Sequence, residues 1–124
     1  MLAYYSRVAP EILVAVQIES CQGLANVEAI AAVQGIDALF IGPVDLRISL
    51  GLVPALDGEE PAWNDAVDRI AAAAQKHGRA LSTVTDGKPA SVEKWSKRGF
   101  GLITVGSDLA LLSSSTENLF QSLQ

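Results

Sequence analysis

Apolar runs rich in β-branched residues alternate along the chain with segments whose apolar positions recur at helical spacing. The first kind predicts buried strands and the second predicts amphipathic helices. The predicted strands cover residues 12–19, 38–43, 80–85 and 102–105, and the predicted helices cover residues 23–33, a segment from Pro61 to Gly78, residues 89–98, and a last segment from Ser107 or Asp108. Four such β-α units predict an α/β fold with parallel strands and right-handed crossovers.

The apolar stripes of the two longest predicted helices indicate where the core lies. The stripe of the helix from Pro61 consists of Trp63, Ala66, Val67, Ile70, Ala73 and Ala74. The stripe of the last helix consists of Leu109, Leu112, Leu119 and Leu123. We expect both stripes to face the core. Residues 47–60 form a long irregular stretch, which we expect to lie over the rim of the sheet and to help select a substrate.

The first predicted strand ends in polar residues. Side chains alternate along a strand, so Val14, Val16 and Ile18 share one face, while Gln17 and Glu19 lie on the other. The first face suits packing under helices. The second carries its polar groups at the carboxyl end of the strand, where a barrel holds its catalytic groups and an open sheet has its switch-point crevice. A solvated strand end is the alternative explanation for Glu19.

A second carboxylate follows the next strand. Gly42 and Pro43 turn the chain and Asp45 follows two residues after Pro43, so Glu19 and Asp45 belong at the same rim. Parallel strands lie about 4.8 Å apart, so the two carboxylates can share a hard cation such as Mg²⁺ or Mn²⁺. No His or Cys is placed to complete a zinc site. The backbone N–H groups from Val44 onward could receive a carboxylate, or Asp45 could simply cap the turn.

Composition narrows the classes of function. The chain has 124 residues, is 49% hydrophobic and carries a net charge of −5, which predicts one globular domain over residues 1–124. Its nine basic residues form no cluster, so nucleic acid is not an expected partner. No apolar run is long enough to cross a membrane. The single cysteine, Cys21, suits the reducing cytoplasm, and we expect it to be a small packing residue.

Three segments together resemble the HpcH/HpaI aldolase family. They are VQIES, GLANVEAIAAVQGIDALFIGPVDLRISLG and LITVGSDLALL. The likeness covers nearly the whole chain and implies a TIM-type barrel with metal-dependent, class II aldolase chemistry on pyruvate-type enolates. A complete barrel needs about 250 residues, and the four units here resemble its strands five to eight. The resemblance therefore implies a half-barrel that is completed by self-association or by a complementary half-barrel.

The resemblance also implies roles for individual residues. Glu19 and Asp45 match metal ligands, and Gln17 matches a glutamine of the catalytic pocket. The residues that match the substrate cradle are Gly42, Pro43, Val44 and Asp45. The implied metal is Mg²⁺ or Mn²⁺, with Co²⁺ as a third option. The implied substrates are small 2-oxo acids and aldehydes, which the metal would activate as a Lewis acid.

Two residues of the family site have no counterpart in this chain. The family's arginine and histidine come from the strands that are missing here. His77 ends a helix that leads into a strand, so we expect it at the opposite rim, near the negative end of the helix dipole. Arg47 follows Asp45 closely, and we expect it to be a solvated loop residue.

Three functions therefore remain open. The first is a metal-dependent carbon–carbon lyase, and the second is a non-catalytic remnant or binding module that keeps the fold. The third is a citrate-lyase-like enzyme that acts on CoA esters. The sequence shows no Gly-rich nucleotide loop, Walker lysine or G-x-S-x-G elbow, which argues against nucleotide and serine-hydrolase chemistry.

Overall fold

The fold is built on a four-stranded parallel sheet with the strand order β1-β2-β3-β4. The computed structural model describes residue 8 and residues 11–123. The strands are β1 (Ala15–Ile18), β2 (Ala38–Ile41), β3 (Ala80–Val84) and β4 (Leu102–Thr104). The prediction of an α/β fold with four parallel strands is thus confirmed, although each strand is shorter than the sequence indicated. The ends of the predicted domain, residues 1–7, 9–10 and 124, lie outside the described residues.

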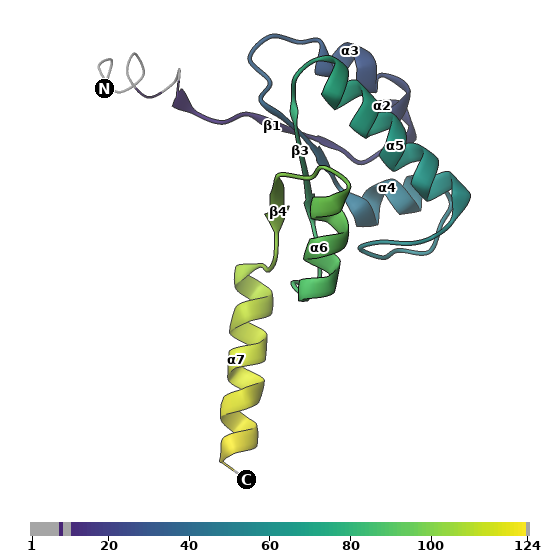
Figure 1. Cartoon of the computed structure of the whole chain (residues 1–124). Helices are drawn as coiled ribbons and strands as arrows, with labels where there is room; N and C mark the ends of the chain where they lie inside the picture. The colour runs from purple at the N-terminus through teal and green to yellow at the C-terminus, as the bar shows by residue number, and fades with distance from the viewer. Residues whose placement is uncertain (1–7, 9–10, 124) are drawn as a thin grey trace.

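Helices follow every strand (Figure 1). They are α2 (Cys21–Ala25), α3 (Val27–Ala31), α4 (Pro43–Ser49), α5 (Pro61–Lys76), α6 (Pro89–Lys97) and α7 (Asp108–Ser122). The single helix predicted over residues 23–33 is wrong, because it is interrupted at Asn26. The Asn26 side chain donates to the carbonyl of Gln22 at 2.8 Å, a local bond of the kind that competes with helix continuation.

Prolines and glycines bound the helices as predicted. Pro61 and Pro89 are the first residues of α5 and α6, where a missing N–H is tolerated. Gly78 and Gly99 follow the two helices with φ of 64° and 89°, the left-handed region in which glycine is unstrained. These four residues therefore set the lengths of α5, which packs over β2 and β3, and of α6, which packs against β4.

One face of the sheet holds the core. Ile18 and Ile41 are paired across β1 and β2 and are almost fully buried, with α5 packed over β2 and β3. All six residues of the predicted α5 stripe are buried. Trp95 of α6 stands edge-on to Trp63, with 6.4 Å between ring centroids, and so joins the two helices. Val14, predicted for this face, precedes β1 and is 42% exposed.

The other face of the sheet is open at both edges. A row of paired residues crosses it from Gln17 through Phe40 and Ser82 to Leu102. The outer members, Gln17 and Leu102, are exposed, and the inner hydroxyl of Ser82 is buried without a hydrogen-bond partner within the described part of the chain. Because β1 and β4 are the outer strands of the sheet, their outward backbone groups are available for further pairing.

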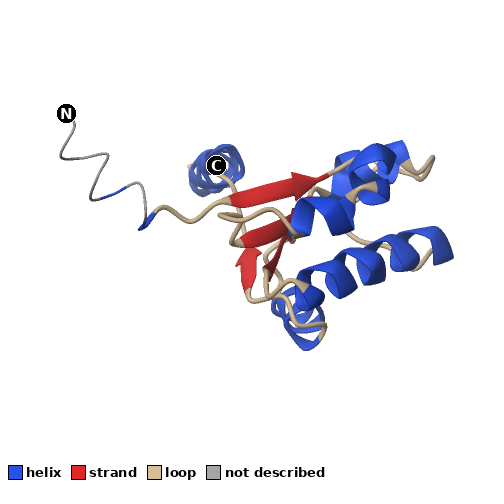
Figure 2. Ribbon diagram, turned by 90° about the horizontal axis from the view of Figure 1, so that it is seen from above, coloured by secondary structure: helices blue, strands red, loops and turns tan. Residues whose placement is uncertain are grey.

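Helix α7 does not pack against the core, which contradicts the prediction. Leu109, Leu112, Leu119 and Leu123 are between 59% and 74% exposed, and α7 extends away from the other helices in Figure 1. Figure 2 gives the view from above, in which this helix is seen end-on at the C label. An apolar stripe indicates that a helix face packs against another surface, but it does not identify that surface. None of the described elements packs against this face of α7. None of the described helices is long and apolar enough to cross a membrane.

Candidate functional site

Gln17 and Glu19 meet at the carboxyl end of β1. They lie on the same side of the strand, two residues apart, and both are exposed. The Gln17 amide nitrogen Nε2 donates to Glu19 Oε2 at 2.6 Å. Oε1 of Glu19 has no hydrogen-bond partner among the described residues, and the bond to Oε2 restricts the rotamers of the carboxylate. Glu19 is thus an oriented oxygen donor at the rim of the sheet.

Gly42 packs directly against this pair from the end of β2. Its N–H donates to the carbonyl of Ile18 at 3.1 Å, which ties the ends of β1 and β2 together. A Cβ atom at position 42 would lie 2.5 Å from Gln17 Nε2 and 2.9 Å from the Cβ of Glu19. The φ of Gly42 is −85°, a value that any residue can adopt. Glycine is required here because there is no space for a side chain.

Asp45 lies three residues beyond Gly42, in the first turn of α4. Pro43 is buried as the first residue of this helix, whereas Val44 and Asp45 are exposed. The N-cap is Gly42 and no side chain caps the helix, so the alternative role of Asp45 as an N-cap is wrong. A carboxylate in the first turn also faces the positive end of the helix dipole.

Arg47 lies in α4, so the predictions that the irregular stretch begins there and that this arginine is a solvated loop residue are wrong. It is 2% exposed instead of solvated. Its Nη1 and Nη2 atoms donate to the two carboxylate oxygens of Glu60 at 2.9 and 2.6 Å, and Nε donates to the carbonyl of Val53 at 2.8 Å. The guanidinium also lies 5.4 Å from the ring centroid of Trp63. Burial of a charged group is tolerated when it is paired and hydrogen-bonded in this way.

These contacts fasten residues 51–60, which we call the strap. Asp57 of the strap accepts a hydrogen bond from Trp63 Nε1 at 3.0 Å and pairs with Lys94 of α6 at 2.6 Å. Glu60, the last residue of the strap, is the N-cap residue of α5 and the partner of Arg47. The strap therefore links α4, α5 and α6 through charged side chains. No sequence periodicity marks such a network. The opposite charges at positions 47 and 60, and at positions 57 and 94, are its signals in the sequence.

A further contact joins α2 to α4. The N–H of Cys21 donates to Ser49 Oγ at 2.8 Å, and the Cys21 thiol donates to the Ser49 carbonyl at 3.0 Å. Cys21 is exposed, so its predicted role as a packing residue is wrong. Its position follows from the adjacent ends of β1 and β2, which bring the two following helices together.

His77 lies at the opposite rim, as predicted. It is the C-cap residue of α5, and Nε2 lies 2.8 Å from Glu28 Oε1 of α3. Lys76 pairs with the same carboxylate. The hydrogen bond from Lys76, followed by that from His77, lowers the pKa of Glu28. His77 is therefore engaged in a contact between helices, far along the strands from Glu19.

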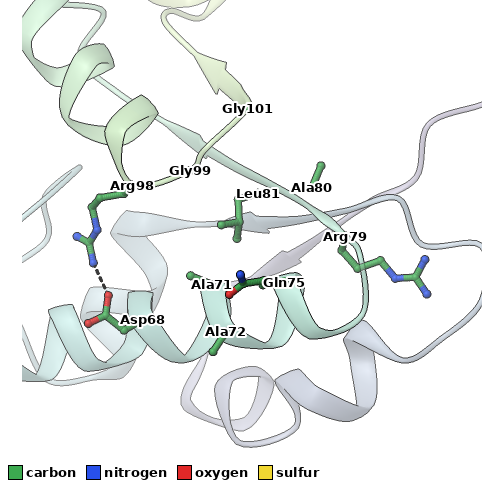
Figure 3. Close-up of a pocket in the computed structure, with 10 residues that line it drawn as sticks. All are labelled: Asp68, Ala71, Ala72, Gln75, Arg79, Ala80, Leu81, Arg98, Gly99 and Gly101. Atoms are coloured by element: carbon green, nitrogen blue, oxygen red, sulfur yellow. Dashed lines mark hydrogen bonds and ion pairs between the residues drawn. The ribbon is translucent and has the colours of Figure 1, made fainter.

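A cavity of about 600 Å³ also lies at the opposite rim (Figure 3). Gly101 and Arg79, which precede β4 and β3, belong to its lining. Arg98 in its wall is paired with Asp68 at 2.7 Å, and the Arg79 guanidinium donates to two carbonyl oxygens at the end of α3. Because these charges already have partners, the cavity offers no free catalytic group, and the candidate site remains the rim at Glu19 and Asp45.

The donor set at this rim suits a hard cation. No cluster of three or more His, Cys, Asp and Glu side chains occurs among the described residues. Two carboxylates are nonetheless a common protein contribution to a Mg²⁺ site, because this ion keeps several waters and takes substrate oxygens as well. The oriented carboxylate of Glu19 and the close approach at Gly42 fit that use.

Comparison with family models matches residues 4–115 to the family described as HpcH/HpaI aldolase/citrate lyase. The chain belongs to this family, so the resemblance drawn from the sequence is confirmed. The four parallel strands agree with the partial barrel that was expected.

Individual relatives are similar over almost the whole chain. The 5-keto-4-deoxy-D-glucarate aldolase of Klebsiella pneumoniae is 37% identical over 116 residues, which are 94% of this chain and 44% of that protein. An HpcH/HpaI aldolase/citrate lyase family protein from Burkholderia cenocepacia superposes with a TM-score of 0.79 at 35% identity, over 97% of this chain and 46% of the other. Macrophomate synthase gives 0.78 at 27% identity, over 96% and 41%. The chain thus spans about half the length of these relatives.

The close approach at Gly42 generates a stability prediction. Replacing Gly42 by Ala should displace Gln17 or Glu19 and lower the free energy of unfolding by about 1–3 kcal/mol, the usual cost of overpacking. Urea denaturation measures this change. The control is Gly101→Ala, since a Cβ there would meet nothing within 4 Å. Equal stability of the two variants would show that Gln17 and Glu19 do not lie against Gly42.

The Arg47–Glu60 pair generates a pH prediction. The hydrogen bond from Arg47 lowers the pKa of Glu60 to about 2 from an ordinary value of 4.5. A lowered folded-state pKa stabilises the protein fully above pH 4.5, and this contribution disappears as the pH falls from 4.5 towards 2. Urea unfolding should show a deficit for Glu60→Gln at pH 7 that shrinks at pH 3.

The control for this experiment is Glu93→Gln. Glu93 pairs with Lys97 on the exposed surface of α6, and such pairs contribute at most about 1 kcal/mol. A Glu60→Gln deficit that stays constant between pH 7 and pH 3 would contradict the assignment.

Proposed function

We propose that this chain carries the metal-binding part of a carbon–carbon lyase that acts on 2-oxo acids. The observation behind the proposal is the arrangement around Gly42, where Glu19 is oriented by Gln17 and Asp45 follows in the first turn of α4. The family supports aldolase or lyase chemistry. Because relatives about one-third identical are named 5-keto-4-deoxy-D-glucarate aldolase, an aldolase of keto acids is favoured over a lyase of CoA esters.

In this proposal Glu19 and Asp45 hold Mg²⁺ or Mn²⁺. When bound, the ion supplies Lewis-acid stabilisation of the negative charge that develops on the keto oxygen of the substrate. Gln17 keeps the Glu19 carboxylate in its binding rotamer through the amide hydrogen bond. Gly42 and Pro43 shape the turn, and the main chain from Val44 onward faces the carboxylate of the 2-oxo acid.

Among the described residues, His77 and Arg47 do not supply the histidine and the arginine that the family resemblance implies. His77 is engaged with Glu28 and Arg47 with Glu60, so neither is free to transfer a proton or to polarise a carbonyl at this rim. A binding module without turnover is therefore the second candidate function. It would retain metal affinity at Glu19 and Asp45 without accelerating any reaction.

We further propose that other βα units cover the open face of the sheet in the active form. The exposed side chains of Gln17 and Leu102 on this face, and the free edges of β1 and β4, support this arrangement. Such units could come from a second copy of the chain or from a complementary half-barrel. Either source would protect the ladder groups at the edges.

The lyase proposal predicts metal binding that depends on both carboxylates. Glu19→Gln and Asp45→Asn should each abolish Mn²⁺ binding by calorimetry and Mn²⁺-dependent decarboxylation of oxaloacetate, because each removes one charged ligand. Oxaloacetate is a suitable probe since its decarboxylation passes through the pyruvate enolate. Glu93→Gln, on the exposed surface of α6, is the matched control and should behave like the wild type.

The outcomes separate the two candidate functions. Metal-dependent turnover that is lost in both variants supports the lyase. Mn²⁺ binding without turnover, lost in both variants, supports the binding module. Unchanged Mn²⁺ affinity in both variants would rule out this rim as the metal site.

The assembly proposal predicts the mass of the particle in solution. Light scattering on the purified 124-residue chain should give at least twice the mass of 13.0 kDa, because the open face and edges would be covered by another copy. If a complementary chain is required instead, the isolated chain should lack cooperative unfolding. A monomer that unfolds cooperatively would contradict both arrangements.

A further inference from the structure

Helix α4 carries one proposed metal ligand, and the bonds from Cys21 to Ser49 hold its last residue but not its first turn. It is seven residues long and lacks a side-chain N-cap. Leu46, which is fully buried, and Arg47, which is 2% exposed, are the long side chains that fix it to the body of the protein. Asp45 lies between the start of the helix and these anchors. The direction in which Asp45 points therefore depends on how α4 is held.

Arg47 holds the helix with a geometry that few side chains can reproduce. Its three hydrogen bonds run to both oxygens of Glu60 and to the carbonyl of Val53. The strap passes so close that a Cβ at Gly58 would clash with the guanidinium and with Glu60. A lysine could reach only part of this set, because an ammonium group lacks the planar fork. The pair thus fixes both distance and angle between α4 and the strap.

The other ligand does not share this dependence. Glu19 follows β1, whose pairing with β2 and whose bond from Gln17 do not involve the strap. The bonds from Cys21 hold Ser49, the last residue of α4, whereas Asp45 lies in the first turn. A loosened first turn would therefore move Asp45 relative to Glu19. The affinity for a shared cation depends on the distance between the carboxylates of Glu19 and Asp45.

We propose that Arg47 is a positioning residue of the metal site, which orients α4 through its bidentate pair with Glu60 and thereby sets Asp45 against Glu19. The inference rests on the proposed function, since it takes these two carboxylates as the ligands. Arg47 touches neither substrate nor metal. Its contribution is to affinity for the ion, which binding measurements on the full chain detect without any assay of activity.

The test compares two anchors of the same strap. Arg47→Met removes the anchor on α4, and Lys94→Met removes the anchor on α6, where Lys94 pairs with Asp57. Mn²⁺ dissociation constants are measured by calorimetry and by the electron paramagnetic resonance of free Mn²⁺. We expect Arg47→Met to bind Mn²⁺ about tenfold or more weakly, the usual loss when a supporting residue of a metal site is removed. Lys94→Met should keep the wild-type affinity.

Two further variants guard against unfolding of Arg47→Met. Arg47→Lys keeps the positive charge without the fork, and Glu60→Gln keeps the shape of the partner with one acceptor oxygen. Both should weaken Mn²⁺ binding by less than Arg47→Met while the far-ultraviolet circular dichroism stays that of the wild type. An affinity that falls equally in Lys94→Met and in the Arg47 variants would overturn the proposal, because general loosening of the strap would then explain both.

The result also separates this inference from the function on which it rests. Suppose that the folded Arg47 variants bind Mn²⁺ with wild-type affinity, while Glu19→Gln and Asp45→Asn lose binding. This result would refute the positioning role of Arg47 and support the metal site. Absence of Mn²⁺ binding in the wild-type chain, or unchanged binding in Glu19→Gln and Asp45→Asn, would refute both.

Discussion

The parallel pairing of β1 with β2 is the constraint on which the candidate site depends. Ile18 lies opposite Ile41, so both strands end at the same level and their following segments emerge side by side. Glu19 comes one residue after one strand, and Asp45 is the third residue of the helix after the other. Gly42 lets the two segments approach because it has no side chain. The chemistry proposed here is thus a consequence of strand register and of one missing Cβ atom.

Much of the fold could be predicted from the sequence because its signals are local. Alternating apolar patterns identified the four strands, and Pro61 and Gly78 marked the ends of the longest core helix. The positions of Glu19 and Asp45 at one rim followed from the repeated β-α order. These features need only the periodicity of a few residues and the rule that parallel strands end on the same side of a sheet.

The features that the sequence did not predict depend on contacts between residues that are far apart along the chain. The leucines of α7 form a helical stripe, yet the pattern could not tell that no described element covers it. Arg47 looked like a solvated residue because burial of a charge is uncommon. Its burial depends on Glu60, thirteen residues away, and on the ring of Trp63. Neither partner can be recognised from the residues next to Arg47.

The dependence of α4 on a paired guanidinium has a consequence for natural variation. Replacement of Arg47 removes the main partner of Glu60. Replacement of Glu60 leaves the buried guanidinium of Arg47 without its carboxylate. The two positions should therefore change together among related sequences. An exchange of arginine for lysine should be rarer at the buried position 47 than at exposed arginines. The frequency of paired replacements at positions 47 and 60 among related sequences would measure how strongly selection maintains the position of α4.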